Sequence, residues 1–139
     1  MSASVDMSEY STEVIRFEML PNDILRSVWV GEAQAADIVQ MRKVGAEQRA
    51  RLPDGPSLSL VDRREAAGFG PDTRAEMNLL GEEKPWDYVA LVGVPFGARI
   101  AINLITRALT LLKVDIADVR FFDTEEEGMA WLESKRSAG

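Results

Sequence analysis

The last third of the chain constrains the fold most, because apolar strand-like runs alternate there with helical segments. Residues 89–94 (VALVGV) form a short apolar run closed by Gly and Pro, which is typical of a strand covered on both faces. Residues 98–113 have helical periodicity, and residues 119–123 (VRFFD) indicate a second strand. Residues 124–127 (TEEE) form a capping box that opens a final helix. This order predicts two parallel strands joined by a crossover helix.

The beginning of the chain adds two strands and a helix. Residues 14–20 and 24–30 are rich in strand formers and are separated by the turn signal Pro21-Asn22-Asp23, so they predict an antiparallel hairpin. In residues 32–52 the acidic side chains come early and the basic side chains late, which complements the dipole of a helix.

The middle of the chain continues the alternation. Residues 57–62 predict a third strand, residues 63–70 a Gly-bearing connector, and residues 71–80 a further helix. The expected order is therefore β-β-α-β-α-β-α-β-α, an α/β fold with a mixed sheet. We expect a Ser-rich disordered tail over 1–12 and one domain over 13–135.

Composition excludes several classes of function. The 139 residues carry a net charge of −7, which argues against binding nucleic acid through phosphate neutralisation. The sequence has no Cys and no His, so a Cys/His zinc site, a nucleophile activated by His and a disulfide framework are all excluded. The absence of Cys also fits a cytoplasmic location.

No targeting or membrane-spanning segment is expected. Residues 1–11 are polar and acidic and lack the basic start and apolar core of a signal peptide. The longest apolar stretch, 96–114, is interrupted by Arg99, Arg107 and Lys113, so stable membrane insertion is not predicted.

Few residues suggest chemistry. Asp62 and Asp72 could form a carboxylate pair for a divalent cation or for acid–base work, although helix capping and loop hydrogen bonds are the preferred interpretation. Thr73 and Glu76 have the spacing of a capping box, and Thr73 could alternatively accept a phosphoryl group at the helix start. Residues 93–97 (GVPFG) lack the signature of a nucleotide-binding loop and predict a turn. We therefore predict no catalytic residue set, no metal site and no cofactor.

The helix 98–113 is the most informative element, because its apolar arc spans roughly 200°, wider than one sheet face covers. The side expected against the sheet consists of Ala101, Ile105, Ala108 and Leu112. The apolar residues expected to need further cover are Ile100, Leu104 and Leu111 on one flank, together with Phe96 before the helix, or Ile102 and Leu109 on the other flank. An adjacent helix, another subunit or an apolar ligand could provide that cover.

The chain resembles the STAS-like superfamily in its SpoIIAA-like (STAS/SEC14-like) branch. The matching motifs are residues 89–93 and 119–132, where VRFFDTEEEGMAWL follows a strand VALVG and a long apolar helix. Agreement in the order of elements extends over 14–134. The resemblance implies a single domain with a mixed four- to five-stranded sheet and helices mainly on one face.

The resemblance also implies a site. In partner-switch proteins of this fold a Ser or Thr after an Asp, at the helix start that follows the third strand, is phosphorylated. Asp72 and Thr73 match that pair. The chain departs from the pattern in its longer connector after Asp62, in Pro71, and in Arg74 where Ser or Gly usually stands.

Three functions follow, in order of preference. The first is a non-catalytic regulatory or interaction module that binds a protein partner or a second copy through the 98–113 helix. The second is a module that binds a lipid or another small apolar ligand with the same helix. The third is an enzyme that uses Asp62 and Asp72, for which nothing supplies a nucleophile or a base near neutral pH.

Overall fold

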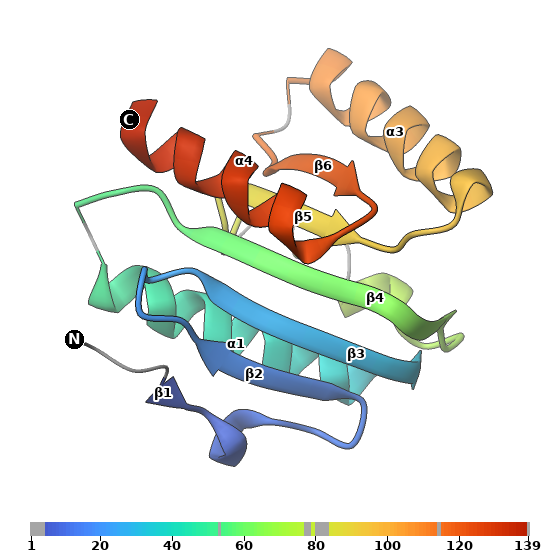
Figure 1. Cartoon of the computed structure of the whole chain (residues 1–139). Coiled ribbons are helices and arrows are strands. Elements are labelled where there is room, and N and C mark those ends of the chain that lie inside the picture. Colours follow the sequence, from blue (N-terminus) through green and yellow to red (C-terminus); the bar gives the residue numbers. More distant parts are fainter. Residues whose placement is uncertain (1–4, 53, 77–78, 80–83, 114, 139) are drawn as a thin grey trace.

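The structure, a computed structural model, describes residues 5–52, 54–76, 79, 84–113 and 115–138 (Figure 1). Its strands are β1 (Val5–Asp6), β2 (Ile15–Met19), β3 (Leu25–Ala33), β4 (Leu58–Phe69), β5 (Tyr88–Val92) and β6 (Asp118–Phe122). Its helices are the short 3-10 helix Ser8–Tyr10, α1 (Ala35–Arg51), α3 (Phe96–Leu111) and α4 (Glu125–Ala138). Residues 74–76 and 79 are also helical. The predicted helix 71–80 therefore falls partly outside the described residues.

The strands form one mixed sheet in the order β1-β2-β3-β4-β5-β6. The pairs β1–β2 and β2–β3 are antiparallel, and the three pairs from β3 to β6 are parallel. The predicted hairpin and the predicted crossover are both confirmed. Crossovers between parallel strands of one sheet are right-handed in nearly all proteins, a rule that places the crossover helices α1 and α3 on the same side of the sheet.

Apolar residues on alternating strand positions build two cores, one on each face of the sheet. On one face Leu25, Trp29 and Val61 pack with residues of α1 such as Ile38 and Met41. On the other face Ile24, Leu60 and Ala90 pack against Leu132 of α4. The period of two along each strand produces this division.

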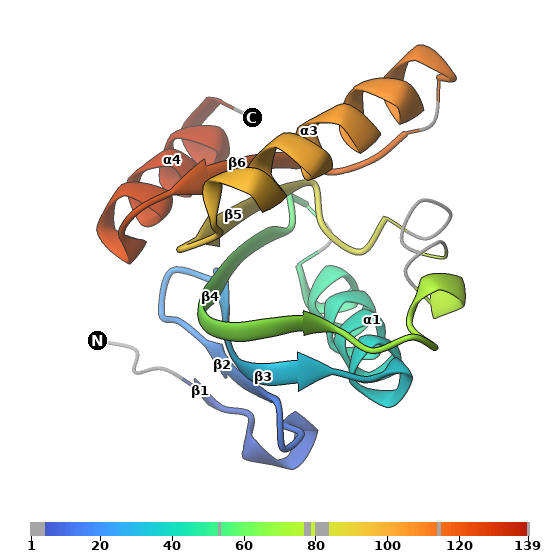
Figure 2. The same ribbon diagram turned by 90° about the vertical axis from the view of Figure 1, so that its right-hand side faces the viewer.

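Helix α3 lies on the same side of the sheet as α1, and α4 lies on the opposite side (Figure 2). The Arg99 guanidinium of α3 sits 5.7 Å from the ring centroid of Phe121. The next residue, Phe122, points to the other face and contacts Trp131 of α4. The predicted arrangement, with helices mainly on one face, is therefore observed.

Two predicted boundaries need correction. The expected tail 1–12 is ordered from Val5, because Val5 pairs with Met19 and the Met7 side chain is buried in the core beside α1. The expected connector 63–70 is strand, because β4 runs past the end of β5 and continues to pair with β3 as far as Phe69. No strand covers residues 63–69 on the β5 side, and most of their side chains are exposed. Polar residues and Gly are therefore tolerated there, and in the sequence they resemble a loop.

Candidate interaction surface

Helix α3 follows the turn 93–95, whose Gly93 has a positive φ of 80°. Pro95 is the N-cap residue, and the helix ends at Leu111 with Leu112 as the C-cap, followed by Lys113 in the left-handed conformation that commonly closes helices. None of the α3 residues is buried. A helix of this length normally gains its stability by burying an apolar side, so the exposure of α3 requires an explanation.

The apolar side of α3 points away from the protein body. Along the side toward the sheet, Arg99, Ile102, Thr106 and Leu109 are half-buried. The opposite side carries six large exposed side chains, which we call the α3 apolar face: Phe96, Ile100, Leu104, Ile105, Leu111 and Leu112. Their exposed fractions range from 47% for Ile100 to 84% for Leu111. The four candidates Phe96, Ile100, Leu104 and Leu111 all belong to this face.

The prediction that Ala101, Ile105, Ala108 and Leu112 pack against the sheet is wrong, since Ile105 is 60% and Leu112 74% exposed. Arg99 explains the difference. Its guanidinium donates to the Val94 carbonyl oxygen at 2.7 Å and to Asp123 at 3.0 Å, and it stacks over Phe121. These contacts hold the polar flank of α3 against the sheet, so the apolar arc faces solvent. Sequence reasoning missed this role because the partners come from a turn and from β6.

The charge of α3 differs from that of the chain. The helix contains Arg99 and Arg107 and no acidic residue, and Lys113 follows it directly, whereas the chain has a net charge of −7. A contiguous exposed apolar surface of this kind is typical of a contact site for another molecule.

The α3 apolar face does not line either of two surface hollows. One, of about 510 Å³, lies beside Gly55, Lys84 and Asp118, and the other, of about 300 Å³, lies beside Arg42, Ala46 and Pro85. Among the described residues, no helix is both long and apolar enough to cross a bilayer.

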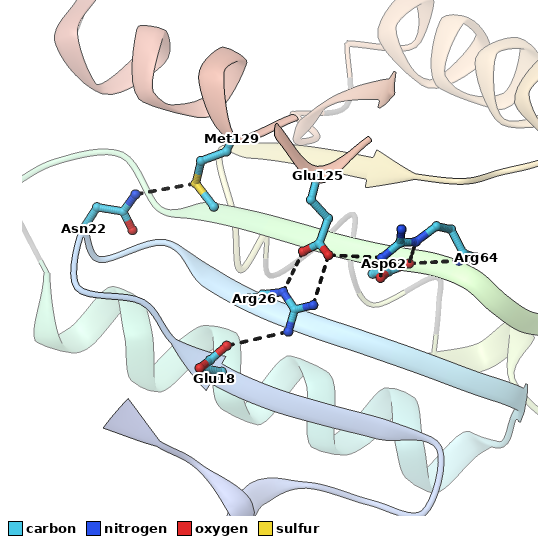
Figure 3. Close-up of polar contacts among 7 residues, drawn as sticks. All are labelled: Glu18, Asn22, Arg26, Asp62, Arg64, Glu125 and Met129. Atoms are coloured by element: carbon cyan, nitrogen blue, oxygen red, sulfur yellow. Dashed lines mark hydrogen bonds and ion pairs between the residues drawn. The ribbon is translucent and has the colours of Figure 1, made fainter. Parts of the chain in front are cut away.

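Asp62 is not free for acid–base work, because it belongs to a network of ion pairs between the sheet and the start of α4 (Figure 3). Arg64 donates to its carboxylate from the backbone N–H at 3.0 Å, from Nε at 3.0 Å and from a terminal nitrogen at 2.6 Å. These bonds hold the pKa of Asp62 below its usual value.

The network continues onto α4 and β3. Arg64 reaches Glu125 at 3.1 Å, and Glu125 accepts two further bonds from Arg26 at 2.6 and 3.0 Å. Arg26 also lies 3.6 Å from Glu18 of β2. The arrangement fixes the start of α4 on the sheet, where Thr124 additionally accepts a hydrogen bond from the Glu127 N–H at 3.2 Å, as the capping pattern predicts.

The alternative of a carboxylate pair between Asp62 and Asp72 does not fit their positions in the fold. Asp72 is exposed and follows the end of β4, while Asp62 lies within the strand. At roughly 3.3 Å per residue the intervening strand separates them by about 15 Å or more. Among the described residues, no group of three or more acidic side chains converges to hold a metal ion.

Thr73 is buried, and its hydroxyl donates to the Gly70 carbonyl oxygen at 2.8 Å. Glu76, the expected reciprocal member of the capping box, is instead paired with Arg42 of α1. Arg74 is exposed beside them. The described part of this segment is thus anchored at Thr73 and Glu76.

The mixed sheet, the element order and the lone α4 on one face define a STAS-like fold of the SpoIIAA type. A protein of the DUF3478 family with a SpoIIAA-like fold, from Shewanella loihica PV-4, shares this fold with a TM-score of 0.63 and 18% sequence identity over 95% of each chain. The anti-sigma factor antagonist SpoIIAA, solved in its unphosphorylated form, matches with a TM-score of 0.58 and 11% identity over 86% of this chain and 97% of the other. No protein-family model and no curated protein matches the sequence.

Proposed function

We propose that the protein is a non-catalytic regulatory module that binds a protein partner, or a second copy of itself, through the α3 apolar face. The observation that carries this proposal is the orientation of α3, which turns six large apolar side chains toward solvent. Burying one such side chain contributes roughly 1.5–3 kcal/mol, so a partner that covers several of them gains substantial free energy. The SpoIIAA-like fold, shared with an anti-sigma factor antagonist, supports a regulatory role.

Light scattering coupled to size exclusion tests the proposal. Leu104→Glu and Leu111→Glu each place a charge on the α3 apolar face, and Val39→Glu is a matched control at an exposed apolar position of α1. We expect the wild type and the control to form a dimer or to bind a protein partner, and the two α3 variants to lose that assembly. A wild type that stays monomeric at high concentration and binds no protein contradicts the proposal.

Binding of a lipid or another small apolar ligand is a second candidate. It is supported by the same apolar face and by the absence of acidic residues from α3. Native mass spectrometry of the protein purified from cells distinguishes the two candidates. A ligand adduct lost in Leu104→Glu favours the second, whereas a protein dimer of unmodified mass favours the first.

We also propose Thr73 as a regulatory phosphorylation site. Its support is its place directly after Asp72 at a helical start, together with the solved SpoIIAA being described in its unphosphorylated form. Because the Thr73 hydroxyl is buried against Gly70, phosphorylation requires this turn to open. Peptide mass spectrometry of the protein from its own cells would detect the phosphoryl group, and its absence under all growth conditions would contradict the idea.

A further inference from the structure

Arg63 occupies an unusual position on β4, just past the last residue that pairs with β5. Its guanidinium carbon lies 4.9 Å from the ring centroid of Trp29 and 4.8 Å from that of Phe69. The two rings stand edge to face, with centroids 6.4 Å apart and an interplanar angle of 72°. The guanidinium therefore fills a corner formed by two aromatic rings on the face of the sheet that also carries α1 and α3.

The backbone of β4 brings these groups together. Relative to β3, β4 contains one extra residue between Asp62 and Glu65 and another between Ala66 and Phe69. Bulges of this kind shorten and bend a strand, and they are rare between parallel strands. The Trp29 indole is itself fixed, because it is buried and its N–H donates to the Ser27 hydroxyl at 3.0 Å. The Trp29 side of the corner around Arg63 is thus fixed in place.

The Arg63 guanidinium has no counter-ion among the residues that the structure describes. Within the described part of the chain it makes no ion pair and no hydrogen bond, whereas the similarly half-buried Arg26 and Arg99 each contact a carboxylate. Burial lowers the pKa of Arg63, and no nearby carboxylate raises it. Its charge is therefore partly removed from water with two aromatic rings but no carboxylate beside it among the described residues, in a protein whose net charge is −7.

Cation–π contacts use the flat face of a guanidinium and leave its five N–H donors without acceptors. Among the described residues, the buried polar side-chain atoms without a hydrogen-bond partner include none from Arg63. Its unpaired guanidinium nitrogens are therefore accessible to solvent. A planar, immobilised and accessible guanidinium matches the geometry of carboxylate and phosphate groups, which it can bind through two parallel hydrogen bonds.

We propose that Arg63, held between Trp29 and Phe69, anchors a binding site for a small oxyanion, either a carboxylate or a phosphate group. The site is independent of the α3 apolar face and does not require it to bind a partner. The competing explanation is that Arg63 only covers the two rings, as a structural clamp.

Nuclear magnetic resonance of the side-chain Nε–H of Arg63 tests the proposal directly. Inorganic phosphate and acetate are titrated in separate experiments, with chloride holding the ionic strength constant. We expect a saturable shift of the Arg63 signal with at least one of them, and the anion that saturates identifies the ligand chemistry. A small, linear drift with both anions would overturn the site and leave Arg63 as a clamp.

Variants make the assignment specific. In Arg63→Lys we expect backbone amides around the site to report binding weakened about tenfold, because losing one charge-assisted hydrogen bond costs about 1.5 kcal/mol. Arg120→Gln is the matched control, since Arg120 also stacks on an aromatic ring, 5.8 Å from the Trp131 centroid, but lies 3.5 Å from the Asp118 carboxylate. Its titration should equal that of the wild type. Equal binding in wild type and Arg63→Lys would count against Arg63 as the anchor.

Discussion

Asp62 shows that neighbouring side chains decide whether a carboxylate is available to bind a ligand. The sequence places it at the end of a strand, where ligands often bind, but Arg64 occupies its carboxylate with three hydrogen bonds. Since Arg64 is only two residues away along β4, its side chain lies on the same face as that of Asp62, and the ion pair has a local signal in the sequence. The partner Glu125 comes from a distant element and has no such signal.

The ion pair predicts a dependence of stability on pH. Arg64 lowers the folded-state pKa of Asp62, so the stabilisation is fully present above the unfolded pKa near 3.9 and is lost as the pH falls through the lower folded value. Asp62→Asn should therefore be less stable than wild type at pH 7, and the difference should shrink toward pH 2. Urea unfolding at several pH values measures it. A difference that stays constant over this range would mean that the carboxylate charge is not responsible.

Gly93 gives a second prediction at the residue scale. Its φ of 80° is costly for other residues, and a Cβ added there would lie 2.3 Å from Cγ of Arg64. Gly93→Ala should lose at least about 1–2 kcal/mol of unfolding free energy from the backbone alone. Gly97→Ala is the control, because a Cβ there meets nothing within 4 Å and alanine favours a helix. Chemical denaturation measures the unfolding free energy of both variants. An equal loss of unfolding free energy in Gly93→Ala and Gly97→Ala would contradict the role assigned to Gly93.

At the scale of elements, α3 and α4 are both amphipathic in sequence but differ in what they bury. Leu132 of α4 is fully buried in the core beside β4 and β5, whereas Leu104 of α3 is 62% exposed. We expect Leu132→Ala to cost about 2–5 kcal/mol and Leu104→Ala to change stability by less than about 0.5 kcal/mol. Thermal or urea unfolding of the isolated protein measures both. A comparable loss in Leu104→Ala would show that α3 packs its apolar face on the body in solution.

The elements also show where sequence reasoning succeeds and fails. The apolar runs of β2, β3, β5 and β6 predict strands correctly, because each has buried or half-buried apolar side chains and is bounded by turn residues. The second half of β4 was missed because its exposed polar and Gly residues resemble a loop. The orientation of α3 was missed because periodicity identifies an apolar side but cannot say whether the protein body or a partner covers it.

For the whole molecule, the sequence suffices for the fold class, since the alternation of strands and helices leaves few topologies for one sheet. The candidate surfaces are different. The α3 apolar face depends on the contacts of Arg99 with Asp123 and Phe121, and the Arg63 corner depends on Trp29 and Phe69. Each surface combines residues that lie far apart in the chain, so it can be identified only from the folded structure.

The folded structure also predicts a distinct dynamic behaviour for α3. The amides of β5 and of residues 58–62 in β4 lie in the centre of the sheet between two cores, so they should exchange with solvent only when the whole domain unfolds. Helix α3 buries no side chain, so it can open alone, and we expect its amides to exchange much faster. Hydrogen exchange measured by mass spectrometry compares the two regions. When a partner covers the α3 apolar face, amide exchange in α3 should slow, and the exchange rates on the exposed side of α1 should stay the same. If α3 amides in the monomer were protected as strongly as those in the centre of the sheet, the helix would already be covered by the protein body.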